Sequence, residues 1–314
     1  MTWTEQAVER LAARAPGGYN GPAPFATEPT ALAALALRLW QNDEAAERAC
    51  AWLLDIQSGD GSFGVDAKNR DPCWATPWVV VALLQSTGGP LPRPNTSEEA
   101  KPASAGGRAA EGEDSSQQKR LRAAEKAVCW LLKVEGRSVK PSEETLRIFG
   151  HDATLHGWPW VKLTTPWVEP TAIALLALQQ AGRADESRSR EAVKLLLDRQ
   201  LADGGWNYGN TTVFGNTLRP HLQPTGLALW ALAWEKGIGP RLQRSLDYLA
   251  GSLDGETTTV SLCYGTIGLS AHKASPASAD AWLQSAATRT LAGDGSPYKL
   301  ALLLLAAKRE ELVS

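Results

Sequence analysis

Several features that define other classes of protein are scarce in this sequence. Its 314 residues include only four cysteines, and none of them form a Cys-x-x-Cys pair. Such scattered cysteines predict reduced thiols in a cytoplasmic protein rather than a disulfide framework. An excess of one charge is also lacking, because 32 Lys and Arg are balanced by 34 Asp and Glu. This balance argues against a protein that binds nucleic acid or an anionic membrane.

Long apolar runs and common catalytic motifs are missing as well. No apolar run approaches the roughly 20 residues that span a bilayer, so we expect no transmembrane segment. The first eighteen residues carry Glu5 and Glu9 and lack the apolar centre of a secretory signal. The sequence contains no G-x-S-x-G, no H-E-x-x-H and no phosphate-cradling glycine loop. A function must therefore be sought in the internal organisation of the chain.

The sequence repeats one phrase, a proline followed by a strongly apolar stretch. Glu28-Pro29-Thr30 precedes ALAALAL, Glu169-Pro170-Thr171 precedes AIALLAL, and Gln223-Pro224-Thr225 precedes GLALWALA. Looser copies begin at Thr76-Pro77 and Ser296-Pro297, and residues 258–272 form a similar segment without proline. Proline suits the first turn of a helix, and a helix that is apolar all round is buried on every side.

A polar amphipathic segment and a turn rich in glycine and aromatic residues precede each apolar segment. The amphipathic segments span roughly residues 4–14, 43–57, 119–134, 187–200, 240–252 and 277–291. The unit is an outer helix, a turn and an inner helix, repeated six times. We therefore predict one all-α domain over residues 1–314, an (α/α)6 toroid of six helical hairpins; the alternative is an open solenoid. Residues 88–118, rich in Pro, Gly, Ala, Ser and Glu, are predicted to be a mobile linker.

In such a ring the inner helices start at one rim, where the long loops 58–76, 135–168 and 201–223 also lie. The chain has 13 Trp against 4 Phe, and several of these Trp fall in the loops. An aromatic rim above apolar helices suits an apolar ligand with a polar head. The alternative is that Trp158 and Trp206 fasten their turns to neighbouring helices. The predicted ligand-binding residues are Trp74, Trp158, Trp160, Trp167, Trp206, Tyr208, Arg219 and Lys162.

Two of the turns resemble a known repeat. Gln57-x-x-x-Gly61-x-Phe63 and Gln200-x-x-x-Gly204-Gly205-Trp206 are similar to the QW repeats of the squalene-hopene cyclase and protein prenyltransferase β-subunit superfamily. The resemblance covers nearly the whole chain except 88–118. It implies an α/α toroid that binds an isoprenoid or a comparable apolar chain in its centre, and a protein partner if the chain acts as a prenyltransferase β subunit does.

The resemblance also suggests where acid catalysis would occur. Class II terpene cyclases of this superfamily carry Asp-x-Asp-Asp, which this chain lacks; the frame of the motif falls on Glu28 and on Glu169. A buried glutamate with a raised pKa can act as a general acid. We predict an enzyme that starts cyclisation or isomerisation with Glu169 as proton donor, with Glu28 and His221 as further candidates. The alternative is that each glutamate only complements a helix dipole.

A metal site is a further hypothesis, although no cofactor is firmly implied. Prenyltransferase β subunits hold zinc with Asp-x-Cys and a later His, and Asp71-Pro72-Cys73 resembles the first half, with His156 as a candidate third ligand. The DDxxD pattern that binds magnesium is absent. The alternative is that Asp71 forms a turn and Cys73 is a buried thiol.

Two other functions remain open at this point. A carbohydrate-active (α/α)6 lyase or hydrolase would use Trp platforms with paired carboxylates or a His–Arg pair, for which Glu28, Glu169, His221 and Arg219 are candidates. A non-catalytic toroid would serve as a lipid carrier or a protein-binding scaffold, and the missing Asp-x-Asp-Asp motif favours this alternative.

Overall fold

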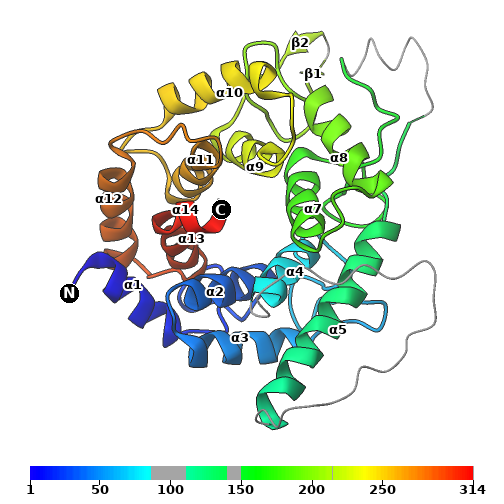
Figure 1. Ribbon diagram of the computed structural model, residues 1–314. Coiled ribbons are helices and arrows are strands. Elements are labelled where there is room, and N and C mark those ends of the chain that lie inside the picture. The colour runs from blue at the N-terminus through cyan, green and yellow to red at the C-terminus, as the bar shows by residue number, and fades with distance from the viewer. Residues whose placement is uncertain (86–110, 140–149, 214, 314) are drawn as a thin grey trace.

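The computed structural model describes residues 1–85, 111–139, 150–213 and 215–313, and within these ranges helices joined by loops are the main secondary structure (Figure 1). The strands among these residues form a short antiparallel hairpin of β1 (Thr212–Val213) and β2 (Asn216–Thr217). The prediction of an all-α chain is therefore confirmed.

Apolar helices form the inner layer of the molecule (Figure 1). They are α2 (Thr27–Leu39), α4 (Thr76–Gln85), α7 (Val168–Gln180), α9 (Leu222–Leu232), α11 (Thr259–Ala271) and α13 (Pro297–Ala307). Each contacts the next in chain order, and α13 also contacts α2. Nearly every residue of these helices is buried, as expected for helices that are apolar all round.

Amphipathic helices form the outer layer and pack one apolar face on the inner helices. They are α1 (Trp3–Ala12), α3 (Asp43–Asp55), α5 (Glu111–Lys133), α8 (Ser187–Asp198), α10 (Gly239–Ser252) and α12 (Ala279–Ala292). The predicted outer segments match these bounds closely. Most of the predicted linker 88–118 lies outside the described residues, but α5 begins at Glu111, so the last eight residues of that segment are helical.

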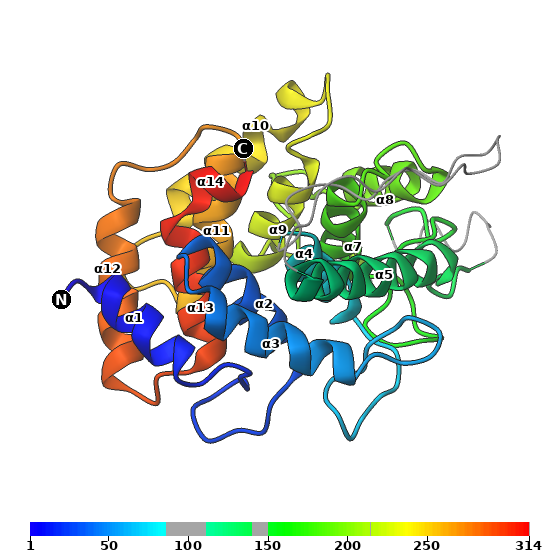
Figure 2. The same ribbon diagram turned by 60° about the horizontal axis from the view of Figure 1, so that its bottom comes forward.

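The last helix, α14 (Arg309–Val313), lies among the inner helices in the view of Figure 1 and contacts α11 and α13. Figure 2 shows α14 beyond the end of α13, at the face where the inner helices finish. No helix among the described residues is both long and apolar enough to cross a membrane.

Candidate functional site

A threonine near the start of four inner helices fastens the preceding turn. In each case its Oγ1 accepts a bond from a backbone N–H of the turn and donates to the carbonyl of the same residue. The pairs are Thr30 with Gly17, Thr76 with Phe63, Thr171 with Trp158, and Thr225 with Trp206. These bonds do not use the side chain of the residue two positions before each threonine, which can therefore make other contacts. Those four residues are Glu28, Trp74, Glu169 and Gln223.

The QW-like turns are fastened to the next outer helix as well. Gln57 Nε2 donates to the carbonyl of Ala123 on α5, and Gln200 Nε2 donates to the carbonyl of Arg241 on α10. Gly204 adopts φ +93°, and a Cβ there would lie 2.5 Å from the carbonyl oxygen of Arg244, so no other residue fits this close approach. These contacts give the repeated turns a structural role.

Glu28 is buried near the start of α2 and accepts two hydrogen bonds on the same oxygen. The hydroxyl of Tyr19 donates to Glu28 Oε2 at 2.6 Å, and the indole N–H of Trp74 donates to it at 3.1 Å. Burial raises the pKa of Glu28, and the bonds from Tyr19 and Trp74 offset only part of that shift, with Trp78 contributing in the same direction. The carboxyl is thus held in a fixed orientation with its protonated form favoured.

Glu169 occupies the equivalent position on α7 and is only 3% exposed. Its Oε1 is buried and has no hydrogen-bond partner. Burial raises the pKa of Glu169 to about 8, and repulsion by Glu28 adds to the shift, whereas the amide of Gln223 lowers it. At neutral pH the carboxyl group therefore holds its proton, and one of its oxygens is left without a hydrogen-bond partner.

Aromatic side chains from the other inner helices complete this region. Tyr264 on α11 stacks on Trp78 of α4 with ring centroids 6.2 Å apart, and Trp230 of α9 lies 6.0 Å from Trp78 on another side. The indole N–H of Trp78 is buried and lies close enough to the Glu28 carboxyl to lower its pKa. Tyr298 on α13 interacts with Tyr264, and burial raises the pKa of both phenols, so both stay neutral. We call Glu28, Glu169, Trp78, Tyr264 and Tyr298 the carboxyl site.

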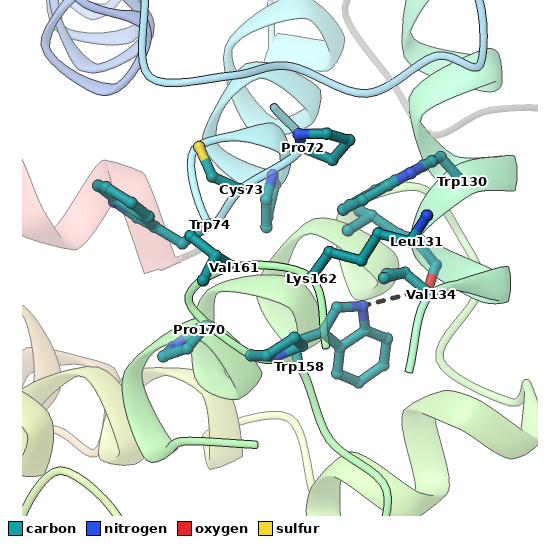
Figure 3. A pocket seen from close by; sticks show the side chains of 12 residues that line it. Pro72, Cys73, Trp74, Trp130, Leu131, Val134, Trp158, Val161, Lys162 and Pro170 are labelled. Carbon is teal, nitrogen blue, oxygen red and sulfur yellow. Dashed lines mark hydrogen bonds between the residues drawn. The ribbon is translucent and has the colours of Figure 1, made fainter. Parts of the chain in front are cut away.

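The predicted rim residues Trp74 and Trp160 lie together beside the carboxyl site. Their rings meet edge to face with centroids 5.4 Å apart, and the Trp74 backbone N–H donates to the Trp160 carbonyl. Figure 3 shows a small pocket next to them, lined by Trp74, Trp158 and Lys162 among others. Its volume of about 10 Å³ admits a single water molecule.

Trp158 and Trp206 are directed toward the outer layer. The indole N–H of Trp158 donates to the carbonyl of Leu131 on α5, as the dashed line in Figure 3 marks, and that of Trp206 donates to the carbonyl of Leu196 on α8. The guanidinium of Arg188 lies 4.2 Å from the centre of the Trp158 ring. These bonds favour the interpretation that both residues fasten their turns.

The remaining predicted residues lie near α7 and α9. Tyr208 and His221 are exposed neighbours with ring centroids 5.2 Å apart, and burial together with the charge of Glu169 raises the pKa of Tyr208. Trp167 precedes α7 and is half-buried, whereas Arg219 is exposed on the loop before α9. The structure therefore brings Tyr208 close to Glu169 and leaves Arg219 at the surface.

The predicted zinc ligands do not converge. No group of three His, Cys, Asp or Glu side chains suited to a metal ion occurs in the ranges that the structure describes. Asp71 is exposed, and burial raises the pKa of the Cys73 thiol to about 12, which disfavours the thiolate that zinc requires. His156 instead lies 3.7 Å from Glu135. These residues do not fit a zinc site.

The similarities to known proteins are similarities of fold. No protein-family model and no curated protein matches the chain. A protein from Actinoplanes, known from its crystal structure, is 15% identical and superposes with a TM-score of 0.56 over 98% of both chains. Native alpha-2-macroglobulin from Escherichia coli, from domain MG7 to the C-terminus, superposes with a TM-score of 0.49 over 98% of this chain and 42% of that one, at 15% identity.

Sequence reasoning missed Tyr19, Trp78, Tyr264 and Tyr298. Trp78 and Tyr298 directly follow the prolines at the start of α4 and α13. In α2 and α7 the glutamate directly precedes the proline. Aromatic residues next to the proline of the repeat were the available signal. Tyr264 lies within α11 and carries no such mark.

Proposed function

We propose that the chain is an (α/α)6 toroid and a divergent member of the squalene-hopene cyclase and protein prenyltransferase superfamily. The order of contacts from α2 to α13 and back to α2 supports this proposal. The bonds of Gln57 and Gln200 to the following outer helices support it too, since they give both QW-like turns a fastening role.

We further propose that the centre of the toroid binds an uncharged, unsaturated apolar ligand of isoprenoid type and that Glu169 protonates it. The supporting observation is the buried, unpartnered Oε1 of Glu169 on a carboxyl group whose pKa is raised to about 8. A group that holds its proton at neutral pH and lies among aromatic rings can act as a general acid.

The proposed step is a proton transfer from Glu169 to one carbon of a carbon–carbon double bond. The π electrons form the new C–H bond, and the other carbon becomes a cation. The faces of Trp78, Trp230 and Tyr264 would stabilise that cation. Return of a different proton to the Glu169 carboxylate completes an isomerisation, and attack by a second double bond before that return gives a ring.

Binding and chemistry are tested separately. Thermal shift assays with squalene, farnesyl and geranylgeranyl diphosphate, oligosaccharides, Zn²⁺ and Mg²⁺ identify the ligand class, because a ligand at about 100 times its Kd stabilises the fold by about 2.7 kcal/mol. Any stabilising isoprenoid is then incubated with the protein in D₂O. Wild-type protein is expected to place deuterium on carbon, whereas Glu169→Gln binds the ligand and does not.

The exposed Glu256 supplies the matched control, and Glu256→Gln is expected to behave as wild type. Equal deuterium incorporation by Glu169→Gln and wild type would remove Glu169 from the reaction. No stabilisation by any isoprenoid would refute the proposed ligand, and stabilisation by an oligosaccharide alone would favour the carbohydrate alternative.

A second candidate function is a non-catalytic carrier or scaffold. The specific observation in its favour is that the buried rings of Trp78, Trp230 and Tyr264 pack on one another and that the adjoining pocket holds only about 10 Å³. Under this alternative an isoprenoid can stabilise the protein, but no product and no deuterium incorporation appear.

A further inference from the structure

A second cavity lies at the opposite end of the inner helices, away from the turns that fasten their starts. Its volume is about 260 Å³, and it forms where α4, α7 and α9 end, with Glu311 and Leu312 of α14 in its wall. We call it the C-terminal cavity. Its walls include Val81, Leu176, Gln179, Trp230, Trp234 and Leu312.

One polar group in the wall of this cavity lacks a partner. Gln179 is 5% exposed, and its Nε2 donates to the carbonyl of Ala231 at 3.1 Å. That bond fixes the orientation of the amide, since only the nitrogen can donate to a carbonyl. Gln179 Oε1 is buried and has no hydrogen-bond partner. A buried acceptor without a donor is costly, and a ligand whose donor reaches this oxygen after a small movement of the side chains around it removes that cost.

The charge around the C-terminal cavity excludes an anion. Among its lining residues Glu311 carries a charge, and it is paired with Lys308 at 2.9 Å. The ends of α4, α7 and α9 present carbonyl oxygens and the negative ends of their helix dipoles. Both features favour a ligand that donates a hydrogen bond and carries no negative charge.

We propose that the C-terminal cavity binds a small, neutral, flat apolar molecule that donates one hydrogen bond to Gln179 Oε1. Its volume lies just below the range of about 300–1,000 Å³ that is usual for sites of drug-sized ligands, which limits the occupant to a compact ring system. Trp230 and Trp234 supply aromatic surface against which such a ring packs. This cavity contains none of the five residues of the carboxyl site, although Trp230 in its wall also contacts Trp78, and the proposal does not rest on the proposed function.

The test compares two probes of the same shape. Indole is flat and carries one N–H donor, and benzofuran replaces that N–H with an oxygen acceptor. Calorimetric titration of the wild-type protein is expected to give indole a Kd at least about tenfold lower than benzofuran, because one hydrogen bond to a buried acceptor distinguishes them. Similar affinities for the two probes, or no binding of indole, would overturn the proposal.

Variants then locate the site. Gln179→Met keeps a similar volume without the acceptor and is expected to remove the preference for indole, whereas the exposed Gln243→Met on α10 retains it. Val81→Phe fills the cavity and is expected to abolish binding of both probes while the helical circular dichroism spectrum stays native. Indole binding that survives in folded Val81→Phe would place the probe elsewhere and refute the assignment. The probe comparison on wild-type protein decides the question even if Gln179→Met fails to fold.

Discussion

Replacing Glu169 with glutamine should make the protein more stable, and the gain should grow with pH. The carboxyl of Glu169 has a pKa of about 8 in the folded protein against a usual value of 4.5. Between these two values the folded state holds a proton that the unfolded chain has released. The folded state therefore loses stability as pH rises through this window, by up to about 5 kcal/mol once pH exceeds 8. Glutamine stays neutral and avoids this loss.

The assay is urea unfolding of wild type and Glu169→Gln from about pH 4.5 to pH 8.5. The difference in free energy of unfolding between them should be smallest near pH 4.5 and should increase in favour of the variant by about 3 kcal/mol by pH 7. Glu256→Gln, which removes an exposed carboxyl, should parallel wild type. Because Glu28 repels Glu169, Glu28→Gln should shift the window to lower pH.

Parallel pH dependences of wild type and Glu169→Gln would refute the reasoning. They would mean that Glu169 is hydrated or paired in solution and that it holds no proton above its usual pKa. The proposed role as a proton donor would then lose its physical basis, whatever ligand the protein binds.

Three further changes test other parts of the structure. Thr225→Val should lower the free energy of unfolding by about 2 kcal/mol, because the buried backbone N–H of Trp206 loses its partner while the Trp206 carbonyl keeps only the bond from His221. Thr225→Ser should lower it less, and equal losses in urea melts would contradict the role of the hydroxyl. Gly61→Ala should lower the free energy of unfolding by about 2 kcal/mol or more, since φ is +94° and a Cβ would lie 2.4 Å from a backbone oxygen of α5. A Cβ at Gly59 meets nothing within 4 Å, so Gly59→Ala should be tolerated, and similar melting temperatures of the two variants would refute this contrast. Tyr19→Phe removes a 2.6 Å hydrogen bond to Glu28 and should raise the pKa of that carboxyl further. The infrared band of the protonated carboxyl should then persist to higher pH, and an unchanged band would show that the bond is absent in solution.

The helical organisation was predictable because it follows from local sequence patterns. Each proline-led apolar stretch became an inner helix, and residues 258–272 were placed correctly as α11 without a proline. The start of α5 was not predicted, since Glu111–Ser116 reads as polar low-complexity sequence and folds as the first turns of a longer helix. α14 was missed because five residues are too short to show a period.

The candidate site was only partly predictable. Glu28 and Glu169 stood out because the same phrase surrounds both, and Trp74 was chosen among the rim aromatics. Tyr264 and Tyr298 could not be chosen in this way, because their relation to the carboxyls depends on contacts between segments that are far apart in the sequence. The direction of Trp158 and Trp206 likewise depends on outer-helix carbonyls that no local pattern reveals.

The threonine bonds do not depend on which side chain stands at four nearby positions. Glu28, Trp74, Glu169 and Gln223 each precede their threonine by two residues, and the fastening of each turn depends on the threonine hydroxyl and the backbone. The helical scaffold is thereby independent of the side chains at these positions, much as an antibody framework is independent of its loops. Combinatorial substitution at these four positions would change the chemistry at the centre while the turns stay fastened.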